Sequence, residues 1–495
     1  MTDRHILIVG GGLAGLSAGC HALRNGYRAT IFEHNLALGG VCTAWRRGPY
    51  LVDGCIHWLT GGAYEPLYEE LGILPRVQLR VLDEWLTYRD ASDGTVVHIT
   101  RDLANLARDL RALAPEDGEE IDRIVAEASR FADLDPGVTR PPEITPLRQQ
   151  LHAFWEMRRS AGALLHYRKP LGAWAREHLR SEALRRFFVH TLPEEAPALF
   201  VLMVYGYLSR GWLSRPVGGT AAFRDALVGD YQRLGGESVL HATVDEILVE
   251  SGRACGVRLD DGTIVRGDAV ISTSSMPETV LRLLAGRYDA GVTRERMQQW
   301  KLFDPIVLAS FGVDAPLAEV PGMLIVDRLA PFTVGGPKKN EHLYVRVCND
   351  DPAIAPRGHA VVQTMIATDY AWWAQRGAGY ESAREEATRI ALEQLDHAIP
   401  GVSEHVRMTD IATPLTYWRQ TRSWRGAYEG WSPNAETMMG HVSKKLSGLR
   451  GFYMAGQWVE PGGGVPTAIM SGRQAVQILC ADDRRPFQTT LPPPT

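Results

Sequence analysis

The chain begins with a glycine-rich segment whose spacing suits the binding of a dinucleotide. The residues Gly10-Gly11-Gly12-Leu13-Ala14-Gly15 follow the apolar stretch Ile6 to Val9 and open a segment with helical spacing. Glycines let the backbone approach a pyrophosphate, and the N-terminus of the helix supplies N–H donors and a favourable dipole. Glu33 ends the next apolar stretch, where a carboxylate can accept hydrogen bonds from both ribose hydroxyls. The same carboxylate argues against a ligand with a 2′-phosphate.

Two further glycine segments fit the same ligand. Gly39-Gly40 lies just past Glu33, where the second half of a dinucleotide would run. Near the other end of the chain, Gly462-Gly463-Gly464-Val465-Pro466 follows the apolar stretch Phe452 to Ala455 and precedes a predicted helix that runs to about Cys480. A helix N-terminus in this place would stabilise negative charge on a reduced cofactor. The sequence therefore predicts one site that both ends of the chain assemble.

The elements that must position these glycines start with a β-α-β unit. Leu13 to Arg24 has helical spacing, Gly26 suits its end, and Arg28 to Phe32 is a second strand, which together predict a parallel sheet. From roughly Asp102 to Arg210 the sequence is helical and rich in arginine. Later predicted elements are strands at Val244 to Glu250, Ala254 to Leu259, Thr263 to Arg266, Ala269 to Ser272, Ile306 to Val313, His342 to Val347 and Ala360 to Ile366, and a helix near Glu381 to His397.

The length predicts two structural units. A chain of 495 residues with 45% hydrophobic content exceeds the roughly 250 to 300 residues that one core usually serves. We predict an α/β fold in which a discontinuous Rossmann-like cofactor domain is joined to a mixed sheet/helical substrate domain. The predicted segments are 1–85, 215–290 and 410–485 for the cofactor domain, 86–214 and 291–409 for the substrate domain, and 486–495 for a disordered tail.

Composition narrows the classes of function. A net charge of -5 and the absence of a long Lys/Arg run argue against a nucleic-acid partner. The six cysteines contain no C-x-x-C pair, and no spacing typical of metal ligands occurs, so we expect reduced thiols and no metal. No signal peptide and no run of about 18 apolar residues is evident, which favours a cytoplasmic protein.

The order of these segments resembles one family. Together with Asp53-Gly54-Cys55-Ile56-His57-Trp58 and Pro216 to Gly219, the glycine segments are similar to the carotenoid desaturase and isomerase branch of the FAD-dependent amine-oxidase-like superfamily. This branch includes phytoene desaturases, carotenoid isomerases and retinol saturases. The resemblance covers the cofactor domain, whereas the middle of the chain matches only in its helical character. It implies FAD as cofactor and desaturation, saturation or isomerisation of a hydrophobic isoprenoid or polyene, with hydride transfer to or from flavin N5.

The resemblance also implies a set of site residues. Catalytic candidates are His57, Trp58 and Tyr428. Two positions depart from the pattern, because many relatives carry Arg at Val41 and an acid at Gln457. The implied FAD contacts are Gly10, Gly12, Leu13, Ala14, Gly15, Glu33, His34, Gly39, Gly40, Val41, His57, Val244, Gly456, Gln457, Gly463, Gly464 and Val465.

Several alternatives stay open at this stage. A flavin amine oxidase that acts on a C–N bond and a non-catalytic flavin-binding carrier compete with the C–C oxidoreductase. No second dinucleotide fingerprint is evident, so oxygen or a quinone would reoxidise the flavin. The basic, aromatic segment 148–190 is interpreted either as a solvated face or as a peripheral contact with the inner face of a membrane.

Overall fold

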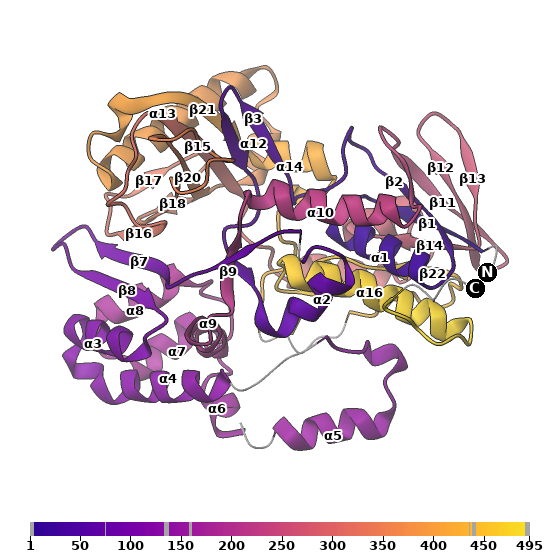
Figure 1. The fold of residues 1–495 in the computed structure, drawn as a ribbon, viewed down its shortest axis with the longest axis horizontal. Helices are drawn as coiled ribbons and strands as arrows, with labels where there is room; N and C mark the ends of the chain where they lie inside the picture. The colour runs from indigo at the N-terminus through magenta and orange to yellow at the C-terminus, as the bar shows by residue number, and fades with distance from the viewer. Residues whose placement is uncertain are drawn as a thin grey trace.

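A five-stranded parallel sheet forms the first layer of the fold (Figure 1). The computed structural model describes residues 4–74, 76–132, 138–157, 161–434, 436–437 and 442–490. Arg158 and Arg159 of the basic segment and residues 491–495 of the predicted tail lie outside the described residues. In spatial order the sheet contains β10 (Glu237–Val239), β2 (Arg28–Phe32), β1 (His5–Val9), β14 (Ala269–Ser272) and β22 (Phe452–Met454).

Three helices pack around this sheet. They are α1 (Leu13–Arg24), α10 (Gly219–Arg233) and α16 (Val465–Asp482). The first and the last run side by side (Figure 1), and the Ser17 hydroxyl donates to the carbonyl of Ile469 at 2.7 Å. A Cβ on Gly472 would lie 2.2 Å from the Ala14 oxygen, so only glycine permits this approach. The two ends of the chain are therefore joined in one core.

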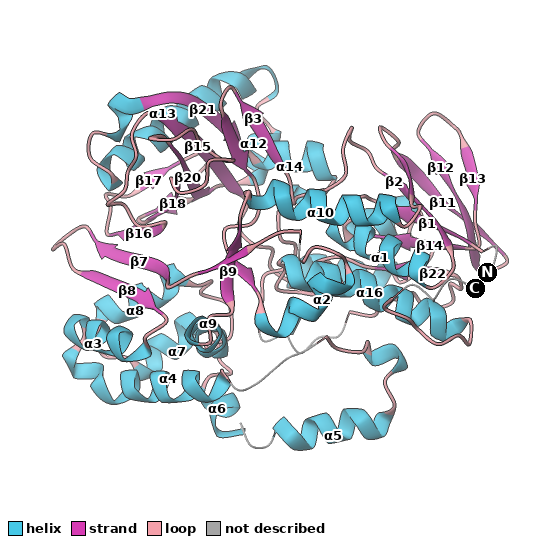
Figure 2. Cartoon of the chain, in the orientation of Figure 1, coloured by secondary structure: helices cyan, strands magenta, loops and turns pink. Residues whose placement is uncertain are grey.

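A seven-stranded sheet forms a second layer (Figure 2). Its strands are antiparallel except for one parallel pair, β16 with β7. Helix α13 (Tyr380–Ala398) packs on this sheet through Ala387, Ala391 and Leu395. In spatial order the strands are β21 (Val406–Ala412), β15 (Ile306–Val313), β20 (Ala360–Ala367), β19 (Leu343–Cys348), β16 (Met323–Asp327), β7 (Glu84–Asp90) and β8 (Val96–Thr100).

A helical region packs against the β7–β8 edge of the second sheet. Apolar side chains at helical spacing, such as Leu106, Leu110, Ile121 and Ile124, share a core with Tyr88 of β7. None of the helices in the described part of the chain has the length and apolar character needed to cross a membrane. The helices are α3 (Leu103–Leu113), α4 (Gly118–Phe131), α5 (Leu147–Met157), α6 (Ala161–His166), α7 (Leu171–His178), α8 (Glu182–Thr191) and α9 (Leu199–Ser209).

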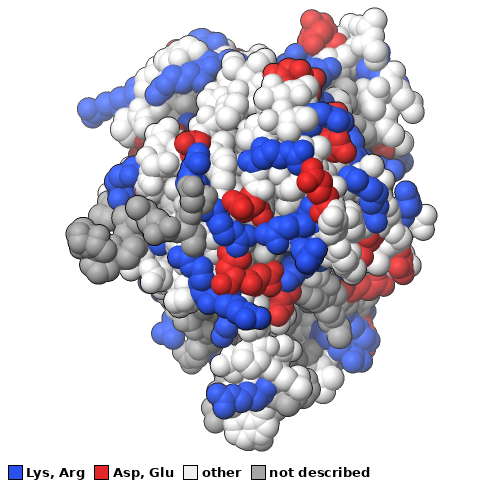
Figure 3. Space-filling view, turned by 90° about the vertical axis from the view of Figure 1, so that its right-hand side faces the viewer, with Lys and Arg blue, Asp and Glu red and all other residues white. Residues whose placement is uncertain are grey.

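Smaller elements complete the fold. The strands predicted at Ala254 to Leu259 and Thr263 to Arg266 are confirmed as β12 (Arg253–Leu259) and β13 (Ile264–Arg266), which pair antiparallel. On the face in Figure 3, Lys and Arg side chains alternate with Asp and Glu. The remaining strands are β3 (Ala44–Arg47), β4 (Tyr50–Asp53), β5 (Leu59–Thr60), β6 (Leu79–Val81), β9 (Leu213–Pro216), β11 (Val244–Glu250), β12 (Arg253–Leu259), β13 (Ile264–Arg266), β17 (Phe332–Thr333) and β18 (Lys339–Asn340), and the remaining α-helices are α2 (Glu65–Glu70), α11 (Ala290–Gln299), α12 (Tyr370–Ala374) and α14 (Pro414–Thr421).

Candidate functional site

A cavity of about 1930 Å³ begins at the carboxyl ends of the parallel strands and continues between the second sheet and the helical region. Ligands of open parallel sheets bind at this edge. The predicted residue Gly15 does not line the cavity. The predicted site residues that do line it are Gly10, Gly12, Leu13, Ala14, Glu33, His34, Gly39, Gly40, Val41, His57, Trp58, Val244, Tyr428, Gly456, Gln457, Gly463, Gly464 and Val465.

The N-terminal glycine turn leaves N–H donors at the cavity wall. Gly10 has a φ of +97°, which a residue with a side chain rarely adopts. Helix α1 starts after Gly12 without a side-chain cap, so its first-turn N–H groups remain available to an anion. Gly15 serves packing instead, because a Cβ there would lie 2.1 Å from the Gly10 oxygen. Glu33 completes the turn by accepting the Gly11 N–H at 2.7 Å.

The second glycine pair lies against the first. Gly39 donates its N–H to the Gly11 carbonyl at 2.8 Å. A Cβ placed on Gly12 would meet no atom closer than the Gly40 Cα at 3.9 Å, so backbone borders open space here. A glycine cradle beside a helix N-terminus and a carboxylate fits the pyrophosphate and one ribose of FAD. Val41 lines the same wall and brings no positive charge.

The C-terminal turn forms the opposite wall. Gly463 and Gly464 have φ values of +64° and +93°, and α16 follows with Pro466 in its first turn and no side-chain cap. Its N–H groups can therefore stabilise negative charge in the cavity. The Gln457 amide donates to the Tyr428 carbonyl at 3.0 Å. This side chain thus lies at the cavity wall and holds the neighbouring segment that carries Tyr428.

His57 stands in a buried polar cluster. Its Nδ1 lies 3.2 Å from the hydroxyl of Tyr344, and the two rings stack with centroids 5.6 Å apart. Burial, with the nearby positive charge of Arg346, lowers the pKa of His57 to about 3. The imidazole is therefore neutral at physiological pH and can orient a ligand by hydrogen bonding, but it does not act as a cationic acid.

Asp53, in the same motif, has a structural role. The Arg346 guanidinium lies 3.3 Å from its carboxylate, and Thr220 donates its backbone N–H at 3.0 Å. Burial alone would raise the pKa of Asp53, but Arg346 and Thr220 hold that pKa below its ordinary value. A Cβ on Gly219 would lie 2.5 Å from the same carboxylate. The glycines before α10 therefore allow the helix to dock on Asp53.

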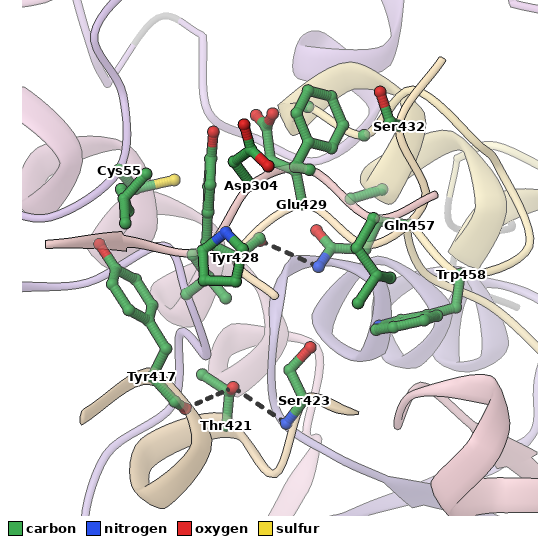
Figure 4. A pocket seen from close by; sticks show the side chains of 18 of the residues that line it. Cys55, Asp304, Tyr417, Thr421, Ser423, Tyr428, Glu429, Ser432, Gln457 and Trp458 are labelled. Atoms are coloured by element: carbon green, nitrogen blue, oxygen red, sulfur yellow. Dashed lines mark hydrogen bonds between the residues drawn. The ribbon is translucent and has the colours of Figure 1, made fainter. Parts of the chain in front are cut away.

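Aromatic rings line the cavity beyond the glycine turns. Trp58 packs edge-on against Trp85, with ring centroids 5.8 Å apart. Tyr428 lies between Phe303 and Tyr417, with ring centroids 5.9 and 6.1 Å away. Figure 4 shows Tyr417 and Tyr428 with the Gln457 bond to the Tyr428 backbone. The rings give this part of the cavity an apolar wall with phenol groups.

The sequence analysis did not identify Glu429, which follows Tyr428, as a site residue. Its side chain is half-buried because one side borders the cavity. Burial raises the pKa of Glu429 from 4.5 to about 7. A carboxyl with this pKa holds its proton for part of the time at neutral pH, as an acid–base group requires. The sequence pattern that could have identified it is a single acidic residue within the aromatic segment Trp424 to Trp431.

Ion pairs between lysines and carboxylates border the cavity. Lys301 lies 2.9 Å from Glu195, and Lys338 lies 2.9 Å from Asp304. Thr273, after β14, lines the cofactor end and donates to the Val9 carbonyl at 2.9 Å. No local sequence pattern identifies these residues, because contacts between distant segments bring each of them to the cavity.

Comparison with known proteins extends over nearly the whole chain. The chain is 24% identical to 4,4'-diapolycopene oxygenase of Methylomonas sp, covering 97% of this chain and 99% of that protein. It is also 24% identical to a lycopene-forming phytoene desaturase of Pseudescherichia vulneris, covering 96% and 99%. These relatives confirm the predicted resemblance to carotenoid desaturases.

Solved structures share the fold. An oxidoreductase from Methanosarcina mazei matches with a TM-score of 0.67 at 18% identity, covering 96% of this chain and 100% of that chain. Putrescine oxidase bound to putrescine matches with a TM-score of 0.61 at 17% identity, covering 97% and 99%. The sequence pattern of the family described as flavin containing amine oxidoreductase matches residues 13–480. The chain therefore belongs to this family and is an FAD-dependent oxidoreductase.

Proposed function

We propose that the protein oxidises carbon–carbon bonds of an elongated hydrophobic substrate, such as a polyene or isoprenoid. The observation that supports this most directly is the apolar extension of the cavity beyond the glycine turns. Its volume of about 1930 Å³ exceeds the roughly 300 to 1,000 Å³ of a typical ligand pocket, which leaves room for substrate beside the dinucleotide. The apolar lining residues of this extension are Trp58, Trp85, Leu86, Phe200, Met203, Leu308, Met323, Ile325 and Met365.

In this reaction the residues of the chain would bind FAD and the substrate and orient them. Bound FAD would supply a two-electron acceptor at flavin N5, so no side-chain nucleophile is needed. The N-terminus of α16 would stabilise the negative charge of the reduced cofactor. Desaturation is the form of the reaction we propose first, with saturation and isomerisation as variants on the same scaffold. Oxygen or a quinone is the proposed terminal acceptor.

A peripheral contact with a membrane through residues 148–190 would give such a substrate a route to the cavity. Leu147, Trp155 and Leu165 on α5 and α6 are 70%, 50% and 64% exposed. Figure 1 places α5 at the periphery of the molecule. By contrast, Arg176 and Arg186 are engaged in ion pairs with Glu194 and Asp327, so acidic partners offset their charge. We therefore propose that α5 and α6, rather than the whole segment, touch an anionic bilayer.

An amine substrate is the second candidate. The Tyr417 and Tyr428 rings, 6.1 Å apart at the cavity wall, offer an aromatic pair to a cation. A carboxylate beside them, Glu429, adds a negative charge when it is deprotonated. Both features suit an ammonium group as well as a polyene.

Anaerobic flavin spectra separate the two candidates. The purified holoprotein is mixed with polyenes, isoprenoids and amines while the absorbance of oxidised flavin is followed. Bleaching by a polyene or isoprenoid supports the proposal, and bleaching by amines alone refutes it. Isomer change without bleaching, with pre-reduced flavin, would assign the isomerase variant. If no compound bleaches the flavin or changes its isomer composition, the result would favour the non-catalytic carrier.

A further inference from the structure

Glu429 lies on a segment that contacts Gln457 and the C-terminal glycine turn, Gly462 to Gly464. Gln457 donates to the Tyr428 carbonyl at 3.0 Å, and the Gly462 N–H donates to the Trp431 carbonyl at 3.2 Å. A Cβ on Gly463 would come within 2.9 Å of the Glu429 Cβ, so the segment touches the glycine turn directly. The backbone that carries Glu429 is thus anchored beside this turn by contacts within the protein.

The partners of Glu429 set it apart from the other carboxylates of the cavity wall. Glu195 and Asp304 pair with lysines, and Glu33 accepts backbone N–H groups. Glu278 and Glu341 pair with arginines. Within the described residues, no hydrogen bond or ion pair engages the carboxylate of Glu429. A carboxyl group that stands on an anchored backbone, borders the cavity and has no hydrogen-bond or ion-pair partner among the described residues is available to exchange a proton with a ligand.

We propose that Glu429 is the proton acceptor for the substrate in this active site. The inference rests on the proposed function, in which a CH–CH unit becomes a C=C bond. One C–H bond would break with both electrons leaving as hydride, for which bound FAD would be the acceptor. The neighbouring C–H bond breaks with its electron pair forming the new π bond, and its proton passes to the Glu429 carboxylate. The substrate loses two hydrogens and two electrons, and the carboxylate becomes a carboxylic acid.

The surroundings of Glu429 suit this role. Burial is the cause that raises its pKa to about 7, and no cation of the described residues forms an ion pair with its carboxylate. Both the carboxylate and the acid are therefore populated near neutral pH, and the proton can return to solvent between turnovers. The titratable and charged groups on elements packed against this segment are Tyr344, Tyr417, Tyr428, Lys301, Asp304 with its partner Lys338, and Glu460 with its partner Lys444.

A test without substrate comes first. Infrared difference spectra of the FAD-loaded wild type and Glu429→Gln are recorded across pH 5 to 9, with Glu393→Gln as the matched control. Glu393 pairs with Arg389 on the surface of α13 and does not line the cavity. We expect a carboxylic-acid band that disappears near pH 7 in the wild type and in Glu393→Gln but is missing from Glu429→Gln. Absence of that band from the wild type overturns the proposal, whatever the substrate.

The second measurement is anaerobic single-turnover flavin reduction by a substrate that bleaches the wild type. Glu429→Gln should slow bleaching at least about 100-fold, the lower range of a general base, and Glu429→Asp should recover part of the rate. An unchanged flavin spectrum would show that both variants fold and hold FAD. A Glu429→Gln rate equal to that of the wild type overturns the inference but leaves the proposed function standing. Bleaching by amines alone overturns the proposed function, while the titration still decides whether Glu429 exchanges a proton.

Discussion

Replacing Gly12 with alanine should weaken FAD binding while leaving the fold intact. The methyl group would meet no protein atom closer than the Gly40 Cα at 3.9 Å. The backbone φ of -70° is also ordinary for alanine. Without FAD, the cost is the weaker helix cap, about 0.5 to 1 kcal/mol in the free energy of unfolding. With FAD, the methyl group takes the space where the pyrophosphate would approach the backbone.

The size of the binding effect follows from the contact that is lost. A hydrogen bond to a charged group contributes about 1.5 to 3 kcal/mol, which corresponds to a rise in Kd of roughly 10- to 150-fold. Titration of apoprotein with FAD, followed by flavin fluorescence, measures Kd. Thermal melts of the apoprotein measure the stability cost.

Two control variants make this result specific. Gly229→Ala on α10 places its Cβ where no atom lies within 4 Å, so Kd should stay close to wild type and the melting temperature should not fall, because alanine favours a helix interior over glycine. Gly15→Ala would clash with the Gly10 oxygen at 2.1 Å and should destabilise the apoprotein itself. An FAD affinity of Gly12→Ala within about threefold of wild type would refute the placement of the pyrophosphate at this turn.

Three further predictions concern buried ionisable side chains. Glu429 binds a proton more tightly in the folded protein, with a pKa of about 7 against 4.5, so it opposes folding increasingly as pH rises through that window. Glu429→Gln should therefore raise stability by about 2 kcal/mol above pH 7, after discounting for water in the cavity, and by nothing below pH 4, as chemical denaturation at several pH values will measure. The pKa of His57 is about 3, so His57→Gln should leave any inflection of the pH–rate profile between pH 5 and 9 in place, and a lost inflection would contradict its neutral state. Arg346→Met should cost about 3 to 5 kcal/mol in thermal melts, because Asp53 stays buried without its cation.

The parts of the site formed by local backbone geometry could be predicted from the sequence. Gly10 to Gly12 and Gly463 to Gly464 could be identified because glycine runs between an apolar strand and a helix start leave backbone N–H groups open to a ligand. The bounds of strand β15, Ile306–Val313, could be predicted, since its residues are buried and mostly apolar, Ser310 being polar.

Residues brought together over long distances in the sequence were not predicted. Tyr344 stacks on His57 from the second sheet. No pattern near either residue reveals that contact. The pKa of Glu429 depends on burial by several separate segments, which a sequence does not display. Sequence reasoning also left the partner of Asp53 unknown, because Arg346 lies on β19.

The measurement that tests the account most directly is a single anaerobic turnover in which flavin bleaching and product mass are determined together. The central claim is that an FAD enzyme of this family oxidises a carbon–carbon bond of a hydrophobic substrate. It predicts that a polyene or isoprenoid loses two hydrogens for each flavin reduced and gains one C=C bond. Release of ammonia from an amine with the same stoichiometry, and no reaction with any polyene or isoprenoid, would contradict it.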